Sequence, residues 1–183
     1  VTTTVNLDPT HSQQTDLTLN VSRRLGELGY DNGVLSLAVA GDRVYAATEN
    51  GLVEFDDRTA TGSPRQVEGG PGHNPVTALA VDRESSIWLA SLGRVYRYWP
   101  GADPGLSRWD AYDADRTGRD VTAVAANGAV VWFGNAAGEL YSFDPEREPE
   151  WQSFSDTDVG HIYDLSVSPS GAVWATGAAG LGY

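Results

Sequence analysis

The stretch Val34-Leu-Ser-Leu-Ala-Val39 returns three more times along the chain with small changes. The later copies are Val76-Thr-Ala-Leu-Ala-Val81, Val121-Thr-Ala-Val-Ala-Ala126 and Ile162-Tyr-Asp-Leu-Ser-Val167. The first residues of successive copies are 42, 45 and 41 positions apart. Short apolar segments that recur every ~40–45 residues are typical of the blades of a β-propeller. The sequence therefore predicts an all-β protein, a β-propeller with four blade repeats.

Each copy is followed by further short segments in the same order. A second apolar segment begins 10 or 11 residues after the first, after a polar turn, at Val44–Thr48, Ile87–Ser91, Val131–Asn135 and Val173–Gly177. A third segment follows a glycine, at Gly51–Asp56, Gly93–Tyr98, Gly138–Asp144 and, in shorter form, Gly180–Tyr183. A weaker fourth segment is found at Pro64–Val67, Ser107–Tyr112 and Glu150–Phe154. Four strands joined by short polar turns predict one antiparallel blade per repeat.

The spacing divides the chain into blade repeats at 34–75, 76–120 and 121–161 and a partial repeat at 162–183. Upstream, alternating apolar residues predict N-terminal strands within 1–33, which could complete the last blade and close a small ring. The alternative is that the chain forms a segment of a larger propeller. We favour the segment, or a part of a larger assembly, because the unpaired edges of an open arc associate readily.

Aromatic residues recur at one position of the second strand, namely Tyr45, Trp88, Trp132 and Trp174. We expect them to pack between neighbouring blades and the three tryptophans to be largely buried, although stacking on a sugar is an alternative. Trp109 and Trp151 occupy equivalent fourth strands, and we expect them to be structural too. Trp99 has no counterpart in the other repeats, so we expect it to contact a partner.

The fourth repeat carries a recognisable pattern. Its residues are Ile162-x-x-Leu165, Ser168-Pro-Ser-Gly171-x-x-Trp174-Ala-Thr176 and Gly180-Leu181-x-Tyr183. This pattern resembles the two-component-regulator propeller repeat, and streptogramin-lyase-like propellers have similar repeats. The resemblance runs from Val34 to Tyr183 and is looser in the first three copies. It implies the fold but separates functions poorly, because propellers carry many unrelated functions.

The composition narrows the classes of partner. The chain has 25 acidic residues against 12 arginines and no lysine, which gives a formal net charge of −13. An acidic surface repels phosphate backbones and anionic lipids, so we expect no nucleic acid and no membrane insertion. The absence of cysteine leaves the redox compartment open. The lack of lysine indicates either a halophilic protein, which uses acidic surfaces to stay dissolved in salt, or codon bias alone.

Two histidines, His73 and His161, each follow a glycine just before an inner strand. The loop before the third inner strand holds Arg119 and Asp120. Loops of this kind gather on one face of a propeller. These four residues are therefore candidates for binding a ligand or partner, or for general acid–base catalysis. In streptogramin-lyase-like enzymes that face carries histidine chemistry and a magnesium site. The alternative is that Gly-His is simply a turn whose imidazole bonds to nearby backbone.

A second candidate is the segment Asp113-Ala-Asp115-Arg-Thr117-Gly118. Alternating oxygen side chains before a glycine resemble the first half of a calcium loop. The distal glutamate of such a loop is missing, because its position is occupied by Val124. Asp113, Asp115 and Thr117 are therefore metal-ligand candidates in a loop that could equally be only solvated.

No catalytic motif is found in the sequence. We therefore expect a binding or structural module that mediates protein–protein interaction or self-assembly, rather than an enzyme, and we expect no cofactor beyond calcium or magnesium. An extracellular or surface location is favoured, with a cytoplasmic one as the alternative. The competing hypothesis is a ligand-sensing or lyase-like propeller that binds a small molecule at the channel mouth.

Overall fold

The structure is a computed structural model that describes residues 33–56, 64–101, 104–113, 116, 119–155 and 157–183. The N-terminal strands expected within 1–33 lie outside the described residues, apart from Gly33. Within the described part of the chain, no helix is both long and apolar enough to span a bilayer.

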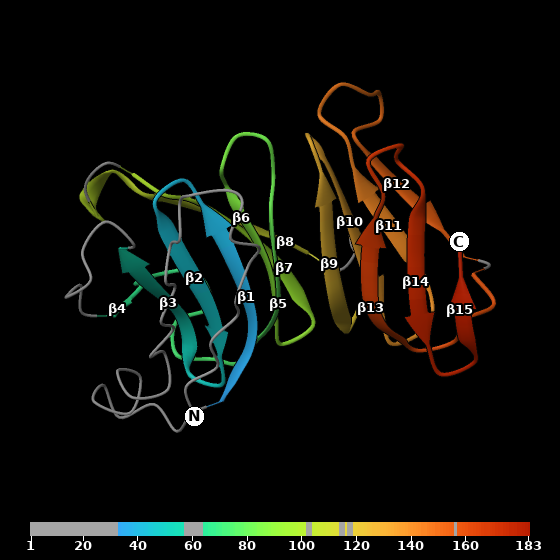
Figure 1. Ribbon diagram of the computed structural model, residues 1–183, viewed down its shortest axis with the longest axis horizontal. Helices are drawn as coiled ribbons and strands as arrows, with labels where there is room; N and C mark the ends of the chain where they lie inside the picture. Colours follow the sequence, from blue (N-terminus) through green and yellow to red (C-terminus); the bar gives the residue numbers. More distant parts are fainter. Residues whose placement is uncertain (1–32, 57–63, 102–103, 114–115, 117–118, 156) are drawn as a thin grey trace, which may run out of the picture.

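Four antiparallel sheets follow one another along the chain and form four blades (Figure 1). The first blade contains β1 (Val34–Ala40), β2 (Arg43–Thr48), β3 (Gly51–Asp56) and β4 (Arg65–Gln66). The second contains β5 (Val76–Val81), β6 (Ile87–Ser91), β7 (Arg94–Trp99) and β8 (Arg108–Tyr112), with a 3-10 turn, η1 (Pro104–Leu106), before β8. The third contains β9 (Val121–Asn127), β10 (Val130–Asn135), β11 (Leu140–Phe143) and β12 (Trp151–Phe154). The fourth contains β13 (Ile162–Val167), β14 (Val173–Gly177) and β15 (Gly180–Gly182).

The predicted all-β propeller fold is confirmed. Each strand pairs with the next strand of the chain, so each blade is a series of hairpins. The strands predicted to be innermost are observed as β1, β5, β9 and β13, and the predicted fourth strands as β4, β8 and β12. The four innermost strands line a common open groove of about 440 Å³.

The turn between the second and third strands of a blade packs closely against the loop that leads into the next blade. Gly51 has φ +109°, and a Cβ added there would lie 2.4 Å from the carbonyl oxygen of Gly72. At Gly138, φ is +86° and an added Cβ would lie 2.8 Å from the carbonyl oxygen of Gly160. Only glycine fits both the positive φ and the close approach, so these turns fix how one blade sits on the next.

Successive residues of a strand point to opposite sides of the sheet, so each blade has one face toward the preceding blade and one toward the following blade. Leu79 of β5 packs with Tyr45 of the first blade, whereas its neighbour Ala80 packs with Val124 of the third blade. Three layers of the hydrophobic core therefore lie between neighbouring blades, and a smaller fourth cluster in the first blade contains Ala46 and Val53.

The four described blades form an open arc. Neighbouring inner strands pack side by side, from β1 to β5, β5 to β9 and β9 to β13. At the two ends, Leu37 of β1 is 46% exposed and Trp174 of β14 is 40% exposed. The first and fourth blades thus do not cover each other as neighbouring blades do.

The burial predicted for the second-strand aromatic residues is not observed at the fourth blade. Tyr45 and Trp88 are fully buried and Trp132 is half-buried, all between blades. The expectation that Trp174 is largely buried is wrong. Its position within its own blade matches that of Trp88, but no described blade follows the fourth one.

Trp109 and Trp151 are half-buried and structural, as expected. The Trp109 indole nitrogen donates a hydrogen bond to the carbonyl oxygen of Glu68 in the first blade at 2.8 Å. Trp151 packs against Trp88 and Phe143, with ring centroids 6.3 and 5.0 Å away. Each of these fourth-strand tryptophans thus reaches back to the preceding blade.

Candidate functional site

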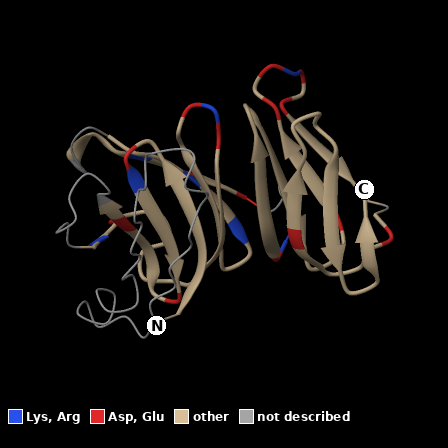
Figure 2. Cartoon of the chain, viewed as in Figure 1, with Lys and Arg blue, Asp and Glu red and all other residues tan. Residues whose placement is uncertain are grey.

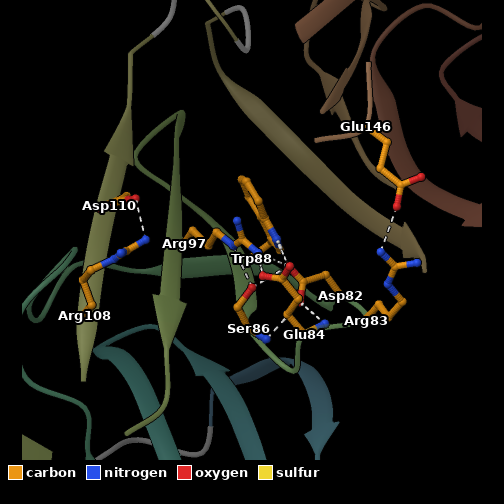
Figure 3. A network of polar contacts seen from close by, with 9 residues as sticks. All are labelled: Asp82, Arg83, Glu84, Ser86, Trp88, Arg97, Arg108, Asp110 and Glu146. Atoms are coloured by element: carbon orange, nitrogen blue, oxygen red, sulfur yellow. Dashed lines mark hydrogen bonds and ion pairs between the residues drawn. The ribbon is translucent and has the colours of Figure 1, made fainter. Parts of the chain in front are cut away.

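A buried ion pair joins the turn after β5 to strand β7 in the second blade (Figure 3). Arg97 Nη2 lies 2.6 Å from a carboxylate oxygen of Asp82, and the two side chains are 11% and 3% exposed. Ser86 and Trp88 donate hydrogen bonds to the same carboxylate at 2.5 and 2.9 Å. At the surface, Glu84 accepts a further bond from Arg97 at 3.0 Å. The charges in this group therefore compensate one another.

Burial of the Asp82 carboxyl would by itself raise its pKa. Hydrogen bonds from Ser86 and Trp88 and the charge of Arg97 outweigh that effect and hold the pKa below its ordinary value. Asp82 is therefore ionised at neutral pH. Because the Arg97 guanidinium also lies 4.8 Å over the Trp88 ring, the network fixes Trp88 for packing on the third blade. It is a structural group rather than a proton-transfer site.

Trp99, the predicted contact residue, lies at the end of β7 and is half-buried. The guanidinium carbons of Arg97 and Arg108 lie 4.3 and 3.9 Å from its ring centroid. The ring also lines a surface hollow of about 310 Å³, together with Arg43 and Glu84. Trp99 is thus held by cation–π contacts within the blade, with part of its ring left open to this hollow.

The four candidate residues His73, Arg119, Asp120 and His161 are all exposed. They precede β5, β9 and β13, so they lie at the rim of the arc where the inner strands begin. His73 lies before β5 and His161 before β13. Because β9 packs between these two strands, the third blade separates the two histidines along the rim. The structure places these residues on one rim but distributes them over three separate loops.

Two of these rim residues also have local structural roles. Asp120 adopts φ +55°, and its carbonyl oxygen accepts a hydrogen bond from the Ala136 amide at 3.1 Å. The ring of His161 packs against Tyr163 with centroids 5.0 Å apart, and its carbonyl accepts a bond from Ala178 at 3.0 Å. The sequence pattern gave no indication of these contacts.

The proposed metal loop is described only in part. Asp113 forms an exposed ion pair with Arg94 at 2.8 Å, whereas Asp115 and Thr117 lie outside the described residues. Among the residues that are described, no group of three or more His, Cys, Asp or Glu side chains could hold a metal ion.

The open groove between the four inner strands is lined by aliphatic side chains such as Leu79 and Val124. Asp164 on β13 brings a carboxylate into the lining, and its Oδ1 accepts a hydrogen bond from the Leu165 amide at 2.9 Å. The lining therefore combines aliphatic side chains with the polar groups of Asp164 and Ser166, and more of its exposed surface is polar than apolar.

An exposed aromatic surface on the fourth blade was not singled out from the sequence. Trp174, Leu181 and Tyr183 are 40%, 65% and 94% exposed, and we refer to them as the blade-4 end face. Trp174 and Tyr183 stack with centroids 5.1 Å apart and planes 29° from parallel. Leu181 pairs across strands with Thr176, two residues after Trp174, and so lies on the same side of the sheet. The sequence did carry one signal for this surface. The second-strand aromatic of each repeat faces the following blade, and Trp174 belongs to the last repeat.

The blade-4 end face is almost uncharged, although the whole chain carries a net charge of −13. Figure 2 shows charged residues at turns and loops and on strands of the first two blades, whereas the sheet of the fourth blade is nearly all tan. Among β13, β14 and β15 the charged residue is Asp164, which pairs with Thr176 and so lies on the same side of the sheet as Trp174. An apolar, aromatic and exposed surface of this kind is typical of an interaction site.

Comparison with solved structures shows what the chain is similar to. A structure of streptogramin B lyase matches with a TM-score of 0.63 at 13% sequence identity, over 78% of this chain and 47% of that chain. The extracellular domain of a hybrid two-component system from B. thetaiotaomicron matches with a TM-score of 0.63 at 18% identity, over 81% of this chain and 20% of that one. The WD40 repeats of RRP9 match with a TM-score of 0.60 at 10% identity, over 79% of this chain and 45% of that one. The chain is a β-propeller.

At these identities the likeness shows the fold alone. The repeats resemble those of the two-component-regulator and streptogramin-lyase-like propellers, in agreement with the sequence pattern. The propeller spans about half the length of the first of these chains and a fifth of the second. No protein-family model matches the sequence, and no curated protein matches it either.

Proposed function

We propose that this propeller is a protein-binding and assembly module whose main contact surface is the blade-4 end face. The observation that carries this proposal is the stacked pair Trp174 and Tyr183, exposed on a face that is apolar and almost uncharged. Burying large aromatic side chains supplies most of the binding energy at protein interfaces. The face therefore suits a protein surface better than a small polar ligand.

The rim residues His73, Arg119, Asp120 and His161 form a second, polar contact surface in this proposal. Their separation over three loops suits a broad partner rather than an acid–base pair. A location outside the cell or on its surface belongs to the same proposal, and similarity to an extracellular domain supports it. Replacing both His73 and His161 by alanine should leave assembly unchanged, whereas a lyase-like propeller would lose its activity.

A tandem extension tests whether the face accepts another blade. A copy of residues 143–183 added after Tyr183 continues the repeat, because it supplies a fourth strand for the last blade and then one more blade. In dilute solution we expect this extension to raise the melting temperature and to shield Trp174 from quenching by acrylamide.

The matched control carries Leu165→Glu in the added copy only, where the leucine would face Trp174. This control should lose the gain in melting temperature and the shielding. If the extended chain and its control melt and quench alike, the blade-4 end face is not a docking surface and the proposed function fails.

A further inference from the structure

We infer that the protein surface that covers the blade-4 end face presents an arginine, which stacks on Trp174 and pairs with Asp164. This inference rests on the proposed function, and it names the chemistry of the partner. It follows from a difference between this face of the fourth blade and the equivalent, covered faces of the second and third blades.

Two neighbouring rows of side chains cross the face of the fourth blade on which Trp174 lies. In one row Trp174 stacks on Tyr183. In the next row Asp164 pairs with Thr176, two residues after Trp174, so Asp164 and Trp174 are diagonal neighbours on the sheet. Diagonal neighbours of this kind lie about 7–8 Å apart. One long side chain of a partner can therefore contact the Trp174 ring and the Asp164 carboxylate together.

The carboxylate of Asp164 stands where the two covered blades have alanine. Ala78 of the second blade and Ala123 of the third pair with the residue two places after the second-strand aromatic, as Asp164 does. Ala123 is 2% exposed in the core layer between the third and fourth blades, whereas Asp164 is exposed. A methyl group suits an apolar junction, but a carboxylate that is covered there loses its hydration.

A surface that covers Asp164 therefore has to supply a counter-charge. The Oδ1 atom of Asp164 accepts a hydrogen bond from the Leu165 amide at 2.9 Å, and no arginine among the described residues pairs with the carboxylate. Covering a carboxylate without a partner is costly, whereas a cation with hydrogen-bond donors offsets the lost hydration. The chain as a whole, with 25 acidic residues against 12 arginines, also favours a basic partner.

The second blade shows how this chain combines an indole, a guanidinium and a carboxylate. The Arg97 guanidinium lies 4.8 Å over the Trp88 ring, and its Nη2 lies 2.6 Å from the Asp82 carboxylate. Arg108 lies 3.9 Å over the Trp99 ring in the same blade. A planar guanidinium stacks on an indole and still donates in-plane hydrogen bonds to a carboxylate, which a lysine ammonium does less well. This precedent favours arginine over lysine as the residue of the partner.

Titration with short peptides, followed by the indole N–H signals in NMR spectra, tests the arginine. The probes are acetyl-Leu-Arg-Leu-amide and the same peptide with citrulline or lysine in the centre. Citrulline has nearly the shape of arginine without its charge. The signal that disappears in Trp174→Phe identifies Trp174. A buffer of about 0.15 M salt, in which the Debye length is about 8 Å, screens distant charges.

Two variants of the chain isolate the carboxylate. Asp164→Asn removes the charge and keeps the shape of the side chain. Glu146→Gln is the matched control, because it removes one negative charge from an exposed ion pair in the turn before β12, away from the end face. Circular dichroism confirms that each variant is folded.

We expect the arginine peptide to shift the Trp174 signal in the unmodified chain and equally in Glu146→Gln. Its binding to Asp164→Asn should be about tenfold weaker, because a hydrogen-bonded charge pair is lost. The citrulline peptide should bind the unmodified chain about tenfold more weakly than the arginine peptide does, and should not distinguish it from Asp164→Asn. The lysine peptide should fall between the other two.

Three results would overturn the inference. The arginine peptide could leave the Trp174 signal unchanged, the citrulline or lysine peptide could bind as tightly as the arginine peptide, or Asp164→Asn could bind the arginine peptide as tightly as the unmodified chain does. In each case the tandem extension still decides the proposed function, because it measures whether the aromatic face accepts a covering surface, whatever charge the natural partner carries.

Discussion

Trp88 and Trp174 occupy the same position in two blades and have opposite surroundings. Trp88 is fully buried against Phe133 and Phe143 of the following blade, with centroids 5.6 and 5.1 Å away. Trp174 is 40% exposed and stacks only on Tyr183 of its own blade among the described residues. The repeat places an aromatic side chain on one face of the blade, but the next blade decides whether that side chain is buried.

The most disruptive test of this comparison removes each ring in turn. Trp88→Ala should lower the free energy of unfolding by about 3–5 kcal/mol, because it empties a closed core layer. Trp174→Ala in dilute solution should cost about 0.5 kcal/mol or less, as for a surface substitution. Urea denaturation of both variants measures the difference. Equal losses would mean that Trp174 is as well packed as Trp88.

The second test concerns the network that holds Trp88. Asp82→Asn leaves the buried Arg97 without its main counter-charge and should cost about 1.5–3 kcal/mol at neutral pH. Because the pKa of Asp82 is lowered in the folded state, its contribution is complete above its ordinary pKa near 3.8 and is lost as the pH falls below that value. The difference in the free energy of unfolding between the unmodified chain and Asp82→Asn should therefore become smaller in acid.

Urea denaturation at neutral pH and again well below the ordinary pKa of Asp82 checks this behaviour. Arg83→Gln is the matched control, because its ion pair with Glu146, at 2.9 Å, is exposed on both sides. The control should change stability little at either pH. A gap for Asp82→Asn that stays constant with pH would show that the carboxylate charge is not what stabilises the network.

The turn glycines offer a finer comparison. Gly51→Ala and Gly180→Ala force alanine into similar positive φ values, so the backbone strain is matched. Gly51→Ala also drives a Cβ into the Gly72 carbonyl, which should add about 1–3 kcal/mol of overpacking. The two melting temperatures report this difference. Similar decreases in melting temperature for the two variants would show that the loop of the next blade moves to accommodate the added Cβ at little cost.

The sequence predicted the parts of this comparison that depend on one repeat alone. The four inner strands, the polar turns and the burial of Tyr45 and Trp88 follow from alternation and spacing. The exposure of Trp174 could not be predicted in this way, since burial depends on whether a neighbouring blade is present. The Asp82–Arg97 pair was also missed, because the two residues are brought together only by the register of β6 against β7.

The candidate site was predicted only in outline. The rim positions of His73 and His161 follow from the order of strands, but the contacts of His161 with Tyr163 depend on side-chain geometry. The end face could not be predicted from the sequence, because Trp174, Leu181 and Tyr183 share a surface only once β14 and β15 are paired.

The smallest expected effect is that of salt. With 25 acidic residues against 12 arginines, the chain repels itself at low ionic strength. The Debye length falls from about 30 Å at 0.01 M to about 3 Å at 1 M, so the melting temperature should rise between dilute buffer and molar KCl. A flat or falling value would leave codon bias as the explanation for the missing lysines.

Residue-resolved hydroxyl-radical oxidation of the three second-strand tryptophans tests the central claim most directly. In dilute solution the account predicts slow oxidation of Trp88, an intermediate rate for Trp132 and fast oxidation of Trp174. At high protein concentration Trp174 alone should become protected. The central claim is that an interface between blades is left unfilled at the end of the arc. Protection of Trp174 at every concentration would contradict it. Equal reactivity of Trp174 and Trp88 would contradict it too.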